Sequence, residues 1–133
     1  MSQQNVEIVK RAIEAYADGG VDALVPFFSR DVVCYPFPEW VEEGVYRGHD
    51  GFRKVAGVWT DTFDDFRLEF DELQDHGSKV VMLGTIGGLI KATGASLRQP
   101  MGAVVADFRK GLIGEMHFFT TWAQALETAG LEG

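Results

Sequence analysis

The sequence is poor in the residues that form disulfides and metal cages, because it has one cysteine, Cys34, and three histidines among 133 residues. A single cysteine excludes a disulfide within the chain and a zinc site built from cysteines. The histidines, His49, His76 and His117, show neither the HxH nor the HxxxH spacing of metal ligands. We therefore expect no bound metal, and the lone cysteine is typical of a reducing compartment.

Basic residues and long apolar runs are also scarce. Twelve Lys and Arg residues stand against 20 Asp and Glu residues, which gives a formal net charge of −8. Nucleic acid phosphates and anionic membrane surfaces repel such a charge, so we expect neither as a partner. No stretch approaches the roughly 18 apolar residues of a membrane span, and residues 1–16 lack the apolar core of a signal peptide. These absences predict a cytoplasmic protein.

Nucleotide-binding motifs are missing as well, although the chain has 16 glycines. The glycine-rich stretch GTIGGLIKATG (84–94) is not followed by the Lys-Ser/Thr pair of a phosphate loop. Glycines inside a long strand more often mark a bend or a bulge. We therefore expect no cofactor, and a curved strand at this place.

What the sequence does contain is a series of helical patterns followed by a series of strand patterns, without a repeat or a linker. Apolar residues recur at helical spacing over 5–18, and Gly19 and Gly20 should end that helix. The spacing changes to strand-like alternation at 66–71, and a short helix closes the chain. The predicted helices cover 5–18, 22–28, 50–62 and 123–129, and the predicted strands cover 32–35, 66–71, 79–91, 97–109 and 112–121.

This order of elements predicts one α+β domain over 1–133, with the helices on one side of an antiparallel sheet. The strands over 79–91 and 101–108 carry apolar residues on both faces. An antiparallel sheet with water on one side should instead alternate. Because the helices can cover only one face, we expect a second copy of the chain to cover the other, as a homodimer.

Three stretches carry a family resemblance: FFSRDVV (27–33), VYRGHDGFRKV (45–55) and ADFRKGLIGEMHFF (106–119). They resemble the nuclear transport factor 2-like superfamily, and the chain looks most like its SnoaL-like group, which includes polyketide cyclases. The resemblance spans about 6–131. It implies a cystatin-like fold, in which a curved antiparallel sheet forms a cone around a cavity closed by the N-terminal helices. Members commonly hold a small apolar molecule in the cavity and dimerise through the outer sheet face.

The stretch VCYPFPEW (33–40) falls where relatives of the ketosteroid isomerase type carry a catalytic aspartate. The matching position here is Tyr35, and the position of a second, protonated aspartate of those relatives is Val104. With both acids replaced, Tyr35 is either a hydroxyl donor to an oxyanion or a wall residue whose hydroxyl reaches water or backbone.

His117 is the candidate base, because histidine titrates near neutral pH and Glu115 precedes it by two residues on the same side of a strand. The resemblance implies, however, that Met116 and Phe118 face the cavity, which would send His117 to the outer face. Both orientations stay open at this point. An inward ring supports catalysis, and an outward ring at an interface removes the only base.

The sequence thus leaves two functions open for one small hydrophobic ligand. The first is a cofactor-independent SnoaL-like cyclase, isomerase or dehydratase that removes a proton next to a carbonyl, with His117 as base and Tyr35 or Tyr16 as oxyanion donor. The second is a non-catalytic module that binds a small apolar molecule. The predicted cavity wall consists of Tyr16, Phe27, Tyr35, Trp40, Trp59, Phe63, Met82, Val104, Met116 and Phe118.

Overall fold

The computed structural model describes residues 2–35 and 45–132, without the side chains of residues 2, 58–60, 131 and 132. Its first helix, α1 (Ser2–Leu24), runs through the glycine pair that was predicted to end it. Gly20 has a φ of 72° and a ψ of −155°, so the helix kinks there and resumes. A 3₁₀ turn, η1 (Val25–Phe27), then leads into the sheet. Two helical pieces were therefore predicted correctly, but they join in one kinked element.

In the described part of the chain, the sheet has six strands in the order β2-β1-β6-β5-β4-β3. Their bounds are β1 (Phe28–Tyr35), β2 (Tyr46–Arg47), β3 (Phe63–Asp75), β4 (Val80–Ile90), β5 (Ser96–Ala106) and β6 (Ile113–Phe119). The pairs β3–β4, β4–β5, β5–β6 and β1–β2 are antiparallel, as expected. The pair β1–β6 is parallel, which corrects the prediction of a purely antiparallel sheet. Helix α2 (Gly48–Thr62) connects β2, at one edge of the sheet, to β3, at the other edge. This helical connection across the sheet allows β1 and β6 to run in parallel.

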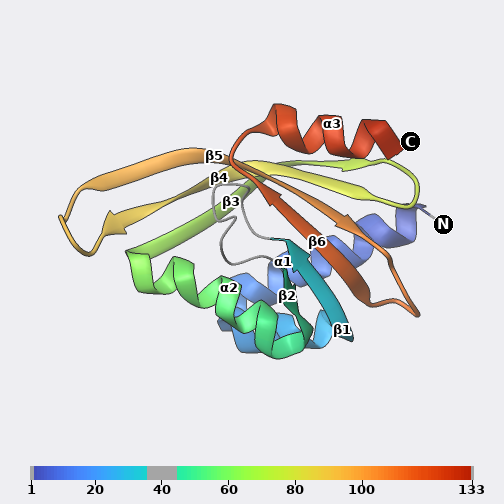
Figure 1. The fold of residues 1–133 in the computed structure, drawn as a ribbon, viewed down its shortest axis with the longest axis horizontal. Coiled ribbons are helices and arrows are strands. Elements are labelled where there is room, and N and C mark those ends of the chain that lie inside the picture. The colour runs from blue at the N-terminus through green and yellow to red at the C-terminus, as the bar shows by residue number, and fades with distance from the viewer. Residues whose placement is uncertain (1, 36–44, 133) are drawn as a thin grey trace.

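The helices lie on both faces of the curved sheet (Figure 1). Helices α1 and α2 lie against the concave face, as predicted, but α3 (Trp122–Glu132) lies on the opposite, outer face. The prediction that all helices share one side is therefore wrong. The physical reason is that the central strands carry apolar residues on both faces. Helix α3 packs Ala125 and Ala129 against Val81, Leu83 and Val104 of the outer face. No helix in the described part of the chain is long and apolar enough to cross a membrane.

The main core lies between the concave face and the two large helices. Alternate residues of β4 and β5, Met82 and Val105 among them, point into it with Val9 and Phe52 from the helices. The residues between them point to the outer face, where α3 buries them. Each of the central strands β4 and β5 thus contributes side chains to two separate apolar clusters.

The sheet bends where a glycine allows two strands to approach closely. A side chain at Gly84 of β4 would lie 1.9 Å from the carbonyl oxygen of Glu69, beside a register shift in β3 between Phe70 and Glu72. The indole of Trp122 in α3 donates a hydrogen bond of 2.9 Å to the Gly84 carbonyl oxygen. The curved strand expected at the glycine-rich stretch is therefore present, and the bend helps to form the hollow of the concave face.

Candidate functional site

A cavity of about 550 Å³ lies between the concave face of the sheet and helices α1 and α2. Most of its lining is aliphatic or aromatic and comes from α1, α2 and five strands. The lining residues are Val9, Ala12, Ile13, Tyr16, Ala17, Gly20, Leu24, Phe28, Phe52, Ala56, Phe66, Arg67, Leu68, Glu69, Phe70, Met82, Val105, Ile113, Met116 and Phe118. This volume is in the range of pockets that hold small organic molecules.

The two charged residues of the lining belong to β3 and direct their side chains to the other face of the sheet. In β3, Leu68 pairs with the inward-facing Ile86 of β4. Arg67 is the preceding residue and pairs with Gly87, so its side chain is directed to the outer face of the sheet. Arg67 forms an ion pair of 3.3 Å with Asp65. Glu69 lies 4.0 Å from the guanidinium of Arg98. Both ion pairs are exposed, so β3 offers the cavity apolar side chains and backbone.

Among the described residues of the lining, Tyr16 has the only other polar side chain. It is half-buried, and burial raises the pKa of its phenol above the ordinary value. Within the described part of the chain, no other group forms a hydrogen bond with its hydroxyl. The cavity therefore presents one hydrogen-bonding hydroxyl in apolar surroundings.

Four of the residues predicted for the wall line this cavity: Tyr16, Met82, Met116 and Phe118. Val104 does not, because it belongs to the outer face, where α3 covers it. Phe27 packs against the main core, and the buried Phe63 packs against Phe66, but neither lines the cavity. Trp40 and the side chain of Trp59 lie outside the described residues.

The lining residues that the prediction missed include Val9, Ile13 and Gly20 of α1. They share one face of the helix with Tyr16, at spacings of three or four residues. The helical period could have found these positions once Tyr16 was chosen. Phe28 and Phe52, which pack with ring centroids 4.4 Å apart, come from separate elements and carry no such signal in the sequence.

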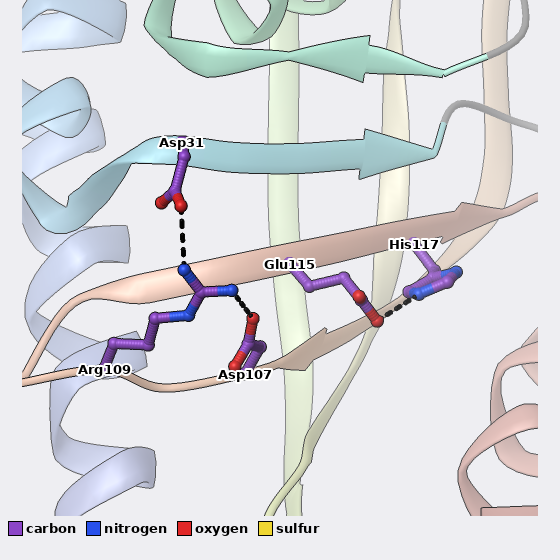
Figure 2. Close-up of polar contacts among 5 residues, drawn as sticks. All are labelled: Asp31, Asp107, Arg109, Glu115 and His117. Atoms are coloured by element: carbon purple, nitrogen blue, oxygen red, sulfur yellow. Dashed lines mark hydrogen bonds and ion pairs between the residues drawn. The ribbon is translucent and has the colours of Figure 1, made fainter.

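His117 points away from the cavity, to the outer face of β6. Its register partners are Tyr35 in β1 and Val104 in β5. The rings of His117 and Tyr35 stack, with centroids 4.2 Å apart and planes 8° apart. The imidazole is 2.8 Å from the carboxylate of Glu115 (Figure 2). The structure thus brings together the residues predicted as base and hydroxyl donor, but it separates both from the cavity.

A second group of charges lies on the same face of the sheet, near the turn between β5 and β6 (Figure 2). Arg109 donates to Asp31 of β1 at 2.8 Å and to Asp107 at 2.5 Å. The nearby hydroxyl of Ser29 and the guanidinium of Arg109 lower the pKa of Asp31. All three charged side chains are exposed. They link β1 to the turn between β5 and β6 and lie outside the cavity.

The remaining histidines have structural contacts. The ring of His49, at the start of α2, lies 3.0 Å from the carbonyl oxygen of Phe28. His76 contacts Gln74 at 2.9 Å beside the turn before β4. Across the described residues, no three His, Cys, Asp or Glu side chains come together as a potential metal site.

Comparison with known protein families gives a match to the SnoaL-like domain over residues 9–116. The chain belongs to the SnoaL-like family. The match includes α2, the central strands and most of the cavity lining. No curated protein sequence matches this SnoaL-like chain.

Solved structures share the fold of this SnoaL-like protein at low sequence identity. A nuclear transport factor 2-like protein of unknown function from Burkholderia pseudomallei is 20% identical, with a TM-score of 0.75 over 93% of this chain and 95% of the other. A SnoaL-like polyketide cyclase candidate from Jannaschia sp. CCS1 is also 20% identical, with a TM-score of 0.75 over 96% and 91%. TerC, crystallised with polyporic acid, is 18% identical, with a TM-score of 0.74 over 96% and 98%. These likenesses show that the chain shares the fold of these proteins.

Proposed function

We propose that this SnoaL-like protein binds a small hydrophobic molecule in the cavity between α1, α2 and the sheet. The observation that carries the proposal is the lining, which directs apolar side chains inward and includes one inward hydroxyl, that of Tyr16. Burial of apolar surface contributes roughly 25 cal/mol per Å², so such a pocket can hold a ring system without any charged contact. The hydroxyl of Tyr16 then orients one polar atom of the ligand.

The geometry favours binding over proton transfer. A base that removes a proton next to a carbonyl has to reach the ligand within hydrogen-bond distance. His117, the candidate base, lies on the outer face with Glu115 and Tyr35. Tyr16 is a poor base at neutral pH, because burial raises the pKa of its phenol and makes the phenolate scarcer. Its neutral hydroxyl is suited to donate a hydrogen bond.

The proposal is tested by filling the cavity. Ala12 of α1 is buried in the lining, and Ala123 of α3 is exposed on the outer face. We expect that Ala12→Phe lowers the affinity for a neutral probe, methyl 2-naphthyl ketone, by at least about tenfold, because the new ring occupies ligand space. Ala123→Phe makes the same change outside the cavity and should bind as the wild type does. Isothermal titration calorimetry measures both affinities, and equal loss in both variants would contradict the proposal.

The same ketone separates binding from catalysis. In D₂O, a base beside the ligand would speed the exchange of the methyl protons next to the carbonyl, which proton NMR follows directly. We expect exchange at the rate of the buffer alone. An acceleration that Ala12→Phe removes and Ala123→Phe keeps would instead support the enzyme hypothesis, with a base outside the described residues.

A further inference from the structure

Among the described residues, no basic side chain is directed into the cavity to pair with an anionic ligand. The chain has 12 Lys and Arg residues and three histidines, and none of them falls among the residues or side chains outside the description. Every basic side chain is therefore placed. Arg67 is the only basic residue of the cavity lining.

Arg67 is not available to a ligand inside the cavity. It stands at the alternate position to the inward-facing Leu68, and its side chain is 69% exposed and paired with Asp65. Its register partner is Gly87, which in turn pairs with Arg98 of β5. The guanidiniums thus belong to the outer face of the sheet, with Asp65 and Glu69 as counter-charges.

The side chains outside the description cannot change this balance toward positive charge. Residues 36–44 contain three glutamates and no basic residue, and residues 58–60 and 131–133 contain no basic residue either. Any charge that these residues add is negative. The protein as a whole carries a net charge of −8, which further disfavours an approaching anion.

An ionised carboxylate loses its hydration when it enters an apolar cavity and recovers the lost energy only through a counter-charge or several hydrogen bonds. The described lining offers one hydroxyl, that of Tyr16. We infer that the cavity selects neutral ligands that carry a single hydrogen-bond acceptor, such as a ketone, and excludes the corresponding carboxylates. This inference rests on the proposed function, since it concerns the ligand class of the same cavity.

The test compares matched ligands that differ only in charge. Methyl ketones and carboxylates on phenyl, 2-naphthyl and 4-biphenyl rings provide three pairs that span the cavity volume. At pH 7.5 we expect at least one ketone to bind, and its carboxylate partner to bind at least about 100-fold more weakly. Equal affinity within the pair would overturn the inference and leave the proposed binding function intact. If Ala12→Phe does not affect ketone binding, or no ketone binds, the proposed function itself fails.

Lowering the pH gives a second readout. An aromatic carboxylic acid has a pKa of about 4, so the neutral fraction rises about tenfold for each pH unit between pH 7.5 and 5.5. If only the neutral acid enters, its apparent affinity rises by the same factor, whereas the affinity of the ketone stays constant. A carboxylate affinity that does not change with pH would overturn the inference.

A charge placed in the cavity should reverse the selection. Ile13 lines the cavity one helical turn before Tyr16 and is half-buried, so Ile13→Lys can bring an ammonium group beside the ligand. We expect this variant to bind the carboxylate at least about tenfold more tightly than the wild type and the ketone more weakly. Gln4→Lys adds the same charge at an exposed position of α1 and should keep the wild-type preference. If both variants gain carboxylate affinity equally, the overall charge determines selection and the inference is wrong.

Discussion

At the scale of the residue, burial rather than sequence context determines how Cys34 behaves. It lies on the cavity side of β1 with no solvent exposure and packs in the main core. Burial raises the pKa of its thiol to about 12, from an ordinary value of 9.0. The sequence predicted an unpaired cysteine, and the structure adds that the thiol stays protonated in the folded state at neutral pH.

This pKa predicts a loss of stability in alkaline solution. The folded-state pKa is raised, so the stabilisation is fully present below the unfolded pKa of about 9 and is lost as pH rises toward about 12. We expect the free energy of unfolding of the wild type to fall by up to about 1.4 kcal/mol per pH unit more than that of Cys34→Ala. Urea denaturation of both proteins at pH 8, 9.5 and 10.5 measures this difference. Parallel pH profiles would show that Cys34 does not couple unfolding to pH.

At the scale of the element, one glycine determines how closely α3 approaches the sheet. Gly102 of β5 lies under the helix, and a Cβ atom there would be 2.7 Å from the Cβ of Ala125 and 3.3 Å from the carbonyl oxygen of Thr121. Such contacts are too short for carbon atoms that are not bonded. The packing of α3 on Val81, Leu83 and Val104 therefore depends on the missing side chain at this position.

We expect Gly102→Ala to destabilise the protein by about 1–3 kcal/mol, because the added methyl group forces α3 away from the sheet. Gly57→Ala is the matched control, since a Cβ atom at Gly57 of α2 meets none of the described atoms within 4 Å and the change should be neutral or slightly stabilising. Urea denaturation measures both. Adding Ala125→Gly to Gly102→Ala should cost less than the two single changes together, and strict additivity would show that the two residues are not coupled.

The helices and strands could largely be predicted from the sequence. The face of each strand that looks toward the cavity, and the strands that pair with each other, could not. Helical and alternating periods predicted both large helices, the four long or central strands and the closing helix, with ends displaced by a few residues. Periodicity gives the alternation of a strand but not which face looks inward. Val104 was therefore assigned to the cavity, and the direction of His117 was left open. The parallel pairing of β1 and β6 depends on contacts between residues far apart in the sequence, such as Val33 with Glu115, which are 82 positions apart and which no local pattern encodes.

At the scale of the molecule, α3 changes the reason for expecting a dimer. The strands with apolar residues on both faces led to the prediction of a second subunit, yet α3 buries the outer apolar residues Val81, Leu83 and Val104 of β4 and β5. The outer face of β1 and β6 is different, because Val33, Tyr35, Glu115 and His117 remain half-buried there. This strip of aromatic, aliphatic and ionisable side chains is the part of the outer face where a second copy would gain most.

We therefore expect a homodimer that forms through this strip. Sedimentation equilibrium should give about twice the 14.7 kDa of the chain at micromolar concentration. Val33→Arg should yield a folded monomer, because Glu115 lies opposite in the register and can pair with the guanidinium inside one subunit. At an interface, the same charge would have to lose its hydration.

Leu89→Arg is the control, and this variant should stay dimeric. Leu89 is 44% exposed and lies near the end of β4, which is away from β1 and β6 (Figure 1). A monomeric wild type would contradict the expectation, and a monomeric Leu89→Arg together with a dimeric Val33→Arg would move the interface to the other end of the sheet.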